Sequence, residues 1–430
     1  MWLSCSVPCA KHWIADMAGT VSQWIEYLEA LNPQVIDLGL ERVVAVAERL
    51  HCRRPAPLTI LVGGTNGKGT TSALMAALLR VQGLSVGVYS SPHLQRYNER
   101  IAVNGEYISD DDLVESLQRV EVARGDVGLT YFEFGTLSAL EYFSRLSLDV
   151  CVLEIGLGGR LDAVNVADAD LTIVTSIGLD HQAWLGDTLE QIAYEKCAIA
   201  RPGRPFVCGQ LNPPGNVQQV VGEREGQWYQ RGVDFDVQLH QQSCQVEFTD
   251  TKQTYRWSLP VPHIPHHNVA TALQSLALLG RLPDEATCQQ VIATLKVGGR
   301  LQRIDAGHQR WFLDVAHNPQ AMSHLAEVLP EVDGIVFSAL EDKPVAELLQ
   351  ALPRHKQLLL AGLSMPRGLS VAQLQSLAAD LPVTGVFASV ADALAYAMQQ
   401  SAQNWLVAGS FYTVEQALNW FDEQGHGAAS

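Results

Sequence analysis

The chain has 430 residues, 47% of them hydrophobic, and a formal net charge of −17. This length predicts two or three domains at roughly 150 residues each, with enough apolar material for globular cores. The negative balance argues against broad nucleic-acid binding, which needs basic surface, although a few Lys and Arg can still gather in one cleft. No apolar run reaches the roughly 20 residues that a membrane span requires, so a membrane protein is not expected.

The first residues and the cysteines indicate a cytoplasmic protein. Lys11 and His12 interrupt the apolar residues of Met1–Asp16, so this segment does not resemble a secretory signal. Met17 is an alternative start, and residues 1–17 are expected to be a disordered extension. The 8 cysteines show no paired spacing, which favours reduced thiols over a disulfide frame or a zinc site.

The first predicted elements form a strand, a loop and a helix. Leu58–Gly63 is a short run rich in β-formers, a glycine-rich turn follows, and Thr70–Val81 has helical periodicity. Val86–Tyr89 is the next predicted strand. Arg100–Ile108 carries an Asn-Gly turn between alternating apolar residues and predicts a hairpin, and Ser109 is a candidate helix N-cap.

The middle of the chain predicts a parallel sheet and a small antiparallel part. Asp149–Ile155 and Leu171–Ile177 are apolar runs that alternate with helical segments, a pattern typical of a parallel sheet covered on both faces. Residues from about Gln227 to Leu259 alternate instead, which predicts an antiparallel excursion before a helix near Asn268–Leu279.

A second, smaller α/β domain of Rossmann type is predicted after a glycine pair near Val297–Arg300. We therefore expect an extension over residues 1–17, an N-terminal domain over 18–296 and a C-terminal domain over 297–430. The strands predicted in the last domain are Trp311–Val315, Gly334–Ser338, Gln357–Ala361 and Asn404–Ala408.

The glycine-rich turn predicts a phosphate-binding loop. Its residues are Thr65, Asn66, Gly67, Lys68, Gly69 and Thr70. Glycines let backbone N–H groups face an anion, the helix N-terminus adds positive potential, and Lys68 supplies a charge to the terminal phosphates. A plain glycine turn with a solvated lysine is the alternative. The match to the Walker pattern is incomplete, because Val62 stands at the first glycine position and Gly69 separates Lys68 from the hydroxyls.

Three side chains just beyond predicted strand ends suit a magnesium ion that accompanies ATP. Ser91, Glu154 and His181 follow three different strands, and the carboxyl ends of parallel strands meet at one edge of a sheet. A hydroxyl, a carboxylate and an imidazole, with water and phosphate oxygens, complete an octahedron. Taken singly, they are also consistent with a turn serine, a strand-end carboxylate and a core histidine.

The segment GTNGKGT resembles the phosphate loop of the bifunctional dihydrofolate synthase/folylpolyglutamate synthases, members of the Mur ligase superfamily. The resemblance runs from about Val21 to Val414 with the motifs in the expected order. It implies that Ser91, Glu154 and His181 bind magnesium and that Lys196 becomes carbamylated. It also assigns nucleotide contacts to Asn268, Arg300 and Asp314, a catalytic role to Lys68, Lys196 and His317, and glutamate binding to Ser410. His263, His266 and His267 are interpreted as loop histidines.

Three further segments resemble the dihydropteroate pocket of these enzymes. They comprise Asp37, Leu38 and Gly39, then Thr130, Tyr131, Phe132 and Glu133, and finally Leu161, Asp162 and Ala163. A flat pterin needs apolar walls and a few polar anchors, which these segments contain. Their structural alternatives are a helix cap for Asp37 and core packing for Tyr131 and Phe132.

The resemblance implies an ATP-dependent ligase that joins L-glutamate to dihydropteroate and to reduced folates through an acyl phosphate. A monomer without nucleic-acid or membrane partners is expected. A folylpolyglutamate synthase with one activity, a cell-wall Mur ligase and a P-loop ATPase switch are the alternatives. Gly69 disfavours the cell-wall ligase, and a switch would not need the motifs around Arg300 and Asp314.

Overall fold

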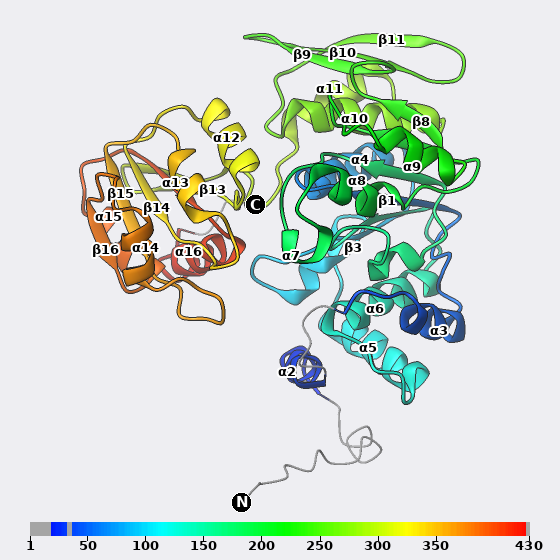
Figure 1. Ribbon diagram of the computed structural model, residues 1–430, viewed down its shortest axis with the longest axis horizontal. Helices are drawn as coiled ribbons and strands as arrows, with labels where there is room; N and C mark the ends of the chain where they lie inside the picture. The colour runs from blue at the N-terminus through cyan, green and yellow to red at the C-terminus, as the bar shows by residue number, and fades with distance from the viewer. Residues whose placement is uncertain (1–18, 32–36, 427–430) are drawn as a thin grey trace, which may run out of the picture.

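The computed structural model describes residues 19–31 and 37–426, arranged as two lobes that lie side by side (Figure 1). The N-terminal lobe comprises the elements α2 to α11, and the C-terminal lobe comprises β12 to α16. The predicted extension over residues 1–17 lies outside the described residues. The predicted domain boundary at 296/297 falls between the last helix of the first lobe and the first strand of the second, and it stays a prediction.

The N-terminal lobe is built on an 8-stranded sheet with the order β4-β3-β2-β5-β1-β6-β7-β8. The pairs from β2 to β8 are parallel, and the hairpin β3–β4 adds an antiparallel edge. The strands are β1 (Leu58–Gly63), β2 (Val86–Tyr89), β3 (Ile101–Val103), β4 (Glu106–Tyr107), β5 (Val150–Glu154), β6 (Leu171–Val174), β7 (Pro205–Cys208) and β8 (Gln227–Gln230).

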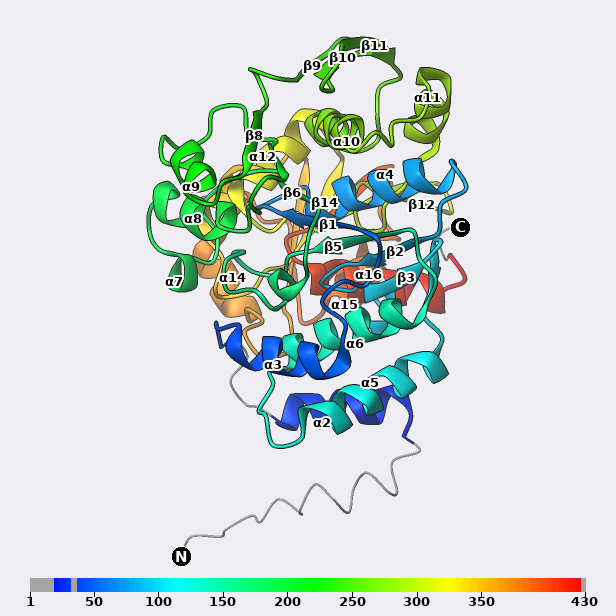
Figure 2. The ribbon, with the colours of Figure 1, turned by 90° about the vertical axis from the view of Figure 1, so that its right-hand side faces the viewer.

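Helices cover both faces of this sheet, as predicted for a parallel sheet. The helices of this lobe are α2 (Val21–Leu31), α3 (Glu41–Leu50), α4 (Lys68–Arg80), α5 (Asp110–Arg124), α6 (Tyr131–Arg145), α7 (Gln182–Leu185), α8 (Leu189–Cys197), α9 (Val217–Glu223), α10 (His266–Leu278) and α11 (Glu285–Thr294), with short 3₁₀ turns η1 (Tyr97–Arg100) and η2 (Ala163–Val166). Figure 2 shows α4 and α10 above the strands and α3, α5 and α6 below them.

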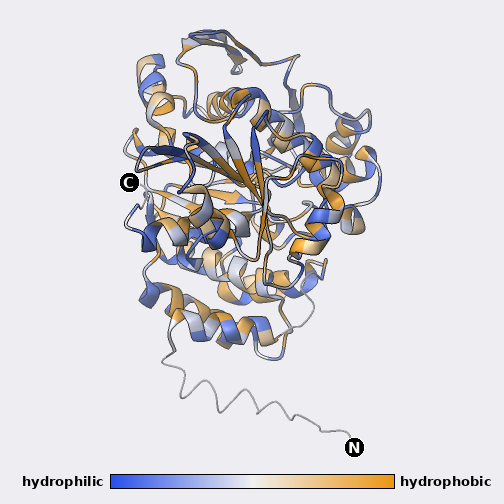
Figure 3. Cartoon of the chain, turned by 90° about the vertical axis from the view of Figure 1, so that its left-hand side faces the viewer, coloured by the Kyte–Doolittle hydropathy of each residue, from blue (hydrophilic) through white to orange (hydrophobic). Residues whose placement is uncertain are grey.

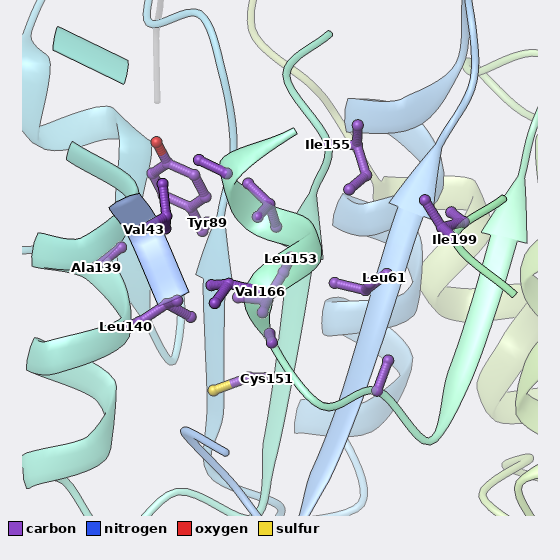
Figure 4. Close-up of a cluster of buried hydrophobic side chains, with 14 of the residues drawn as sticks. Val43, Leu61, Tyr89, Ala139, Leu140, Cys151, Leu153, Ile155, Val166 and Ile199 are labelled. Atoms are coloured by element: carbon purple, nitrogen blue, oxygen red, sulfur yellow. The ribbon is translucent and has the colours of Figure 1, made fainter. Parts of the chain in front are cut away.

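The two faces hold separate cores because successive strand residues point in opposite directions. In β5, Val150 and Val152 pack with α4 and α10, whereas Cys151 and Leu153 pack with α3 and α6. Figure 4 shows the second of these cores, to which Leu61 and Leu153 of the strands and Leu140 of α6 belong.

The predicted local signals at the hairpin and the following helix are confirmed. β3 and β4 pair antiparallel around Asn104 and Gly105, both of which have positive φ. Ser109 precedes α5 with extended backbone, and its Oγ accepts a hydrogen bond from Asp112 N at 3.1 Å. The acidic first turn of α5 adds a favourable interaction with the helix dipole.

The predicted antiparallel excursion is confirmed only in part. β9 (Asp236–Leu239), β10 (Cys244–Thr249) and β11 (Thr254–Leu259) form a 3-stranded antiparallel sheet. The prediction was wrong for β8, which pairs parallel with β7. Trp228 of β8 stacks on Phe206 of β7 with ring centroids 5.8 Å apart, a distant contact that local alternation does not reveal.

The C-terminal lobe contains a 6-stranded sheet with the order β12-β13-β17-β14-β15-β16, in which only the pair β12–β13 is antiparallel. Its elements are β12 (Gln302–Ala306), β13 (Gln309–Asp314), α12 (Pro319–Val328), β14 (Gly334–Phe337), α13 (Val345–Gln350), β15 (Gln357–Ala361), α14 (Val371–Leu377), β16 (Gly385–Phe387), α15 (Val390–Ala397), β17 (Asn404–Ala408) and α16 (Phe411–Glu423). The predicted α/β fold with two parallel-sheet parts is therefore confirmed.

Apolar residues concentrate on the strands of both sheets and on the helix faces against them (Figure 3). The six described cysteines are free and buried. Within residues 19–31 and 37–426, each helix is too short or too polar to cross a membrane.

Replacing Leu153 by Ala should destabilise the protein, because this side chain is fully buried between β5 and its covering helices. We expect the free energy of unfolding to fall by about 2–5 kcal/mol, as for other Leu-to-Ala changes that leave a cavity. Urea denaturation followed by circular dichroism measures this change. The control Leu239→Ala removes a leucine that is 49% exposed and should cost less than about 1 kcal/mol; equal losses would contradict the proposed packing.

Candidate active site

The loop between β1 and α4 is held in place by hydrogen bonds to the segment after β6. Thr65 N donates to Ser176 O at 2.9 Å, and Asn66 N donates to Ser176 Oγ at 2.9 Å. Thr65 Oγ1 also bonds with Gly178, accepting from its N at 3.0 Å. The loop therefore has its shape before any ligand binds, which reduces the ordering cost of binding.

The helix that follows presents free backbone donors to the loop. Gly67 is the N-cap residue of α4, with φ of 87°, and no side chain caps the helix. Asn268 of α10 lies directly behind it, and its Nδ2 donates to Thr70 Oγ1 at 2.8 Å. A Cβ at Gly67 would come 2.6 Å from Asn268 Oδ1, so glycine is required here by both conformation and space. Uncapped N–H groups at a helix start form an anion site.

A cavity of about 400 Å³ opens in front of this loop, and both lobes contribute to its wall. The N-terminal lobe supplies residues that follow the ends of β1, β2 and β5, and the C-terminal lobe supplies Arg300, His317 and Ser410. Carboxyl ends of parallel strands thus converge there, as in other open α/β sheets. The volume suits a small-molecule ligand.

Positive charge without a carboxylate partner is the main electrostatic feature of this cavity. Six lysines and arginines line it. Lys343 pairs with Asp180, and Arg367 pairs with Asp342. The other four have no described carboxylate within ion-pair distance; they are Lys68, Arg100, Lys196 and Arg300. Buried cations are normally paired, so the arrangement favours an anionic ligand.

Glu154 is a buried carboxylate in the wall of the same cavity. It is 5% exposed, and burial raises its pKa to about 7, while the charges of Lys68 and Arg300 oppose that rise. Ser91 and His181 line the same cavity. Burial lowers the pKa of His181 to about 4, so its imidazole is neutral at pH 7 and able to act as a ligand. A carboxylate without an ion-pair partner beside a neutral imidazole and a hydroxyl fits a hard divalent cation.

Lys196 on α8 lies at the wall of the cavity and is 5% exposed. Burial, together with the charge of Lys68, lowers its pKa to about 7. The neighbouring Glu195 does not pair with it, because Glu195 Oε1 accepts from Arg160 Nη2 at 2.8 Å. Lys196 is therefore not an ordinary surface-paired lysine, and a large part of its amine is neutral near pH 7.

Direct contacts join the two lobes at the mouth of the phosphate loop. Asn318 Nδ2 donates to Asn66 Oδ1 at 2.9 Å, and Lys343 Nζ donates to Asp180 Oδ1 at 2.7 Å. Burial alone would raise the pKa of Asp180, but His317, His181 and Lys343 hold it well below its usual range. The C-terminal lobe is thus linked to the segment that carries His181.

Phe132 and a chain of charged groups form the other end of the cavity. Arg42 Nη2 donates to Glu133 Oε1 at 2.8 Å, and its Nη1 lies 2.7 Å from Asp37 Oδ2. Glu133 also closes the capping box of α6 by accepting from Thr130 N at 2.7 Å. The Phe132 ring lies against Gly156, where no side chain would fit. This end therefore combines an aromatic wall with fixed polar groups.

Comparison with known proteins identifies the family. Residues 62–279 match the Mur ligase middle domain, and residues 299–411 match the Mur ligase glutamate ligase domain. The chain is 40% identical to the dihydrofolate synthase/folylpolyglutamate synthase of Escherichia coli, over 95% of this chain and 97% of that protein. The chain belongs to the dihydrofolate synthase/folylpolyglutamate synthase family. The relative of the same name from Haemophilus influenzae is 36% identical, over 92% of this chain and 96% of its own length.

Solved structures of this family have the same fold. Escherichia coli FolC in complex with DHPP and ADP superposes with a TM-score of 0.89 at 39% identity, covering 95% of this chain and 99% of that one. The Yersinia pestis bifunctional folylpolyglutamate synthase/dihydrofolate synthase with AMPPNP and Mn ion gives 0.86 at 40% identity, covering 94% and 98%. Family membership makes this chain a ligase of the Mur type.

Most of the residues predicted for this family's site do line the cavity. They are Asp37, Leu38, Thr65, Asn66, Gly67, Lys68, Gly69, Ser91, Thr130, Phe132, Glu133, Glu154, Leu161, Asp162, Ala163, His181, Lys196, Arg300, His317 and Ser410. The convergence is a finding, whereas the individual roles stay predictions. Asp37 does not cap a helix, since the residue before α3 is Leu40, without a side-chain cap.

Five predicted residues are not among those that line the cavity; they are Gly39, Thr70, Tyr131, Asn268 and Asp314. Thr70 and Asn268 bond to each other beneath the loop. Asn268 lies two residues inside α10, which begins at His266, so the prediction that it starts the helix was wrong. Its Oδ1 is buried and has no hydrogen-bond partner among the described residues. Asp314 accepts from Leu301 N and Ala316 N, both at 2.9 Å.

The remaining histidines predicted as loop residues lie elsewhere. His266 and His267 are in the first turn of α10, and their rings lie near His324 of α12, so the loop assignment was wrong for these two. Among the described residues, no three His, Cys, Asp or Glu side chains form a metal site. The predicted magnesium set contains only two such side chains, so this finding does not bear on it.

Sequence reasoning missed Asp180, Lys343, His93 and Arg100, all of which line the cavity. Asp180 is next to the predicted site residue His181, and Arg100 is the first residue of the predicted hairpin. Their positions along the chain therefore gave a weak indication that they belong to the site. Lys343 offered none, because its partner Asp180 is 163 residues away.

Replacing Gly67 by Ala should weaken binding of a non-hydrolysable ATP analogue by about 10-fold or more, because the new methyl group would displace Asn268 and the loop. Isothermal titration calorimetry measures the dissociation constant. Gly83→Ala is the matched control, since Gly83 has a similar φ of 80° but open space around it. If both variants bind the analogue like the wild type, the loop does not carry the phosphates.

Proposed function

We propose that the protein is an ATP-dependent amide ligase that adds L-glutamate to dihydropteroate, forming dihydrofolate, and to reduced folates, forming polyglutamates. One observation supports this most strongly. A preformed phosphate loop and four basic side chains without a carboxylate partner share a cavity with an aromatic pocket in a chain of the dihydrofolate synthase/folylpolyglutamate synthase family.

The reaction has two chemical steps. A carboxylate oxygen of the acceptor attacks the γ-phosphorus of ATP, the bond to the β-phosphate oxygen breaks, and ADP leaves. The amine of glutamate then attacks the carbonyl carbon of the acyl phosphate, inorganic phosphate leaves, and the ammonium proton passes to solvent or a base. Lys68 and the loop amides hold the phosphates, so positioning and charge neutralisation supply most of the catalysis.

The predicted nucleotide and metal residues fit this scheme. Asn268 has a free buried acceptor that suits the exocyclic amine of adenine, and Arg300 places a charge at the cavity. Asp314 is proposed to contact a ribose hydroxyl of the nucleotide. Ser91, Glu154 and His181 would hold magnesium, which neutralises phosphate charge when bound. The crystal structure of the Yersinia pestis relative with AMPPNP and Mn ion supports ATP and a divalent metal.

The acceptor pocket is proposed at the end of the cavity that holds Phe132. This ring and Leu161 supply apolar walls, and Asp162 supplies a polar anchor. Burial raises the pKa of Asp162 to about 6, although backbone donors such as Leu157 N at 2.7 Å stabilise its charged form. The Escherichia coli relative in complex with DHPP supports a pocket for the acceptor on this fold.

The C-terminal lobe would supply the glutamate site and exclude water from the acyl phosphate. Ser410 caps α16 at the cavity, where its Oγ accepts from Thr413 N at 3.0 Å. His317 is proposed as a catalytic group because its Nε2 lies 3.7 Å from Asp180 Oδ2 beside the loop. A related bifunctional enzyme with Mn, AMPPNP and L-glutamate bound supports glutamate as a substrate.

The other assignments complete the proposal. The protein would act as a cytoplasmic monomer with an ATP-binding domain over residues 18–296 and a glutamate-ligase domain over 297–430. The match of residues 299–411 to the glutamate ligase domain supports that division.

The purified protein should form ADP only when dihydropteroate or a reduced folate is present with glutamate, ATP and magnesium. Mass analysis of each product should show the gain of one glutamate residue on dihydropteroate and of one or more on tetrahydrofolate. Lys68→Met should lower the rate by about 100-fold or more, because it removes charge from the transferring phosphoryl group. A glutamate gain on tetrahydrofolate alone would indicate a folylpolyglutamate synthase without dihydrofolate synthase activity. ADP formation without an acceptor would favour an ATPase switch.

Carbamylation of Lys196 should make activity depend on bicarbonate and pH. The neutral amine adds CO₂, so with a pKa of about 7 the reactive form is lost as pH falls below 7. We expect activity to fall between about pH 7 and 6 and to recover when bicarbonate is added. Native mass spectrometry should detect one added CO₂, absent in Lys196→Ala. The control Lys356→Ala removes an exposed lysine paired with Asp333 and should change nothing; a bicarbonate-independent wild type would contradict this proposal.

A further inference from the structure

Arg100 is a buried arginine at the cavity that none of the roles above uses. It ends the turn η1, directly before β3, and it lines the cavity beside Ser91 and Pro92. Arg100 as a whole residue is 8% exposed. Burying a guanidinium is costly unless other groups compensate its charge.

The groups around Arg100 orient it without neutralising it. Its Nε donates to His93 Nδ1 at 2.8 Å, and its guanidinium carbon lies 5.2 Å from the Tyr97 ring centre and 5.6 Å from that of Tyr131. Ring faces attract the cation, but no carboxylate in the described chain lies within ion-pair distance of it. Tyr131 does not itself line the cavity, so its contact with Arg100 supports the guanidinium without taking part in the cavity wall.

Another buried arginine in the same lobe shows the usual arrangement. Arg124 is 6% exposed, and its Nη2 lies 2.6 Å from Glu121 Oε1, with a second bond from Nε to the other carboxylate oxygen. That bidentate pair satisfies both groups. Arg100 has similar burial and lacks such a partner, so the guanidinium N–H groups that His93 and Tyr89 do not use remain available to an anion in the cavity.

The position of Arg100 indicates which anion this is. Arg100 lines the same cavity as Lys68 and Arg300, so it faces the space in front of the phosphate loop. Its supporting tyrosine is the neighbour of Phe132 at the proposed acceptor pocket. The nucleotide phosphates already have Lys68 and the free amides of α4. The acceptor carboxylate must also reach the γ-phosphate, and it comes from the proposed acceptor pocket at Phe132.

We propose that Arg100 binds the acceptor's carboxylate, the group that becomes phosphorylated, and that His93 donates a second hydrogen bond to the same carboxylate. Because His93 Nδ1 accepts from Arg100, the neutral imidazole carries its proton on Nε2, and His93 also lines the cavity. A planar guanidinium and an N–H donor hold one carboxylate oxygen toward the γ-phosphate and distinguish a carboxylate from a neutral amide. This inference rests on the proposed ligase function.

The test compares binding of pteroate and its carboxamide analogue, each measured by calorimetry with a non-hydrolysable ATP analogue and magnesium present. The wild type should prefer the carboxylate by about 10-fold or more, the size expected for hydrogen bonds to a charged group. Arg100→Met should abolish this preference and leave the affinity for the ATP analogue within about twofold of the wild type, since other groups hold the phosphates. An unchanged preference in Arg100→Met, or a parallel loss of nucleotide affinity, overturns the proposal.

The controls separate a contact from a structural effect. Arg96→Met removes an arginine of the same loop whose side chain is 67% exposed and paired with Asp110, and it should keep the full preference. Thermal unfolding checks that each variant is folded. If Arg100→Met does not fold, Arg100→Lys carries the test: it should lose part of the preference because lysine lacks the planar fork, and a full preference in it overturns the proposal. Failure of the ligase function itself would appear differently, as a wild type that forms no ADP in response to an acceptor.

Discussion

Unpaired positive charge at the junction of two lobes is the constraint on which the site depends. Lys68, Arg100 and Arg300 line a cavity in a chain with a net charge of −17, and none of them has a described carboxylate within ion-pair distance. Such an arrangement is stable only because backbone carbonyls, aromatic faces and helix ends compensate part of the charge. An anionic ligand would complete the compensation, so binding and catalysis use an interaction that the fold leaves unsatisfied.

The parallel sheets explain why these charges meet. In each lobe the loops after the strands lie at one edge, and in this molecule the two edges face each other across the cavity. Asn66 and Asn318 bond across that junction, as do Asp180 and Lys343. A displacement of the C-terminal lobe would break these contacts and remove Arg300, His317 and Ser410 from the cavity together. The site is therefore complete only when the C-terminal lobe holds this position.

Burial shifts the pKa values of acidic and basic groups in the cavity in opposite directions. Burial raises the pKa of Glu154 to about 7 and lowers that of Lys196 to about 7. A carboxylate that is costly to ionise gains most from a nearby cation, and an amine that is costly to protonate is available for carbamylation. The same dry environment also protects an acyl phosphate from water.

The sequence by itself determined the α/β class, the phosphate loop and most strand positions, because these depend on local periodicity and on glycine. The strands β1, β2, β15 and β17 begin and end where the pattern predicts. It also named most residues that line the cavity, through motifs shared with a family. The tertiary structure decided what depends on distant partners. It assigned β8 to the parallel sheet, where Trp228 stacks on Phe206. It left Asn268 and Tyr131 out of the cavity lining, and it brought Lys343 to Asp180. These outcomes depend on residues far apart in the sequence, such as Lys343 and Asp180, which are 163 positions apart, and no local pattern encodes such contacts.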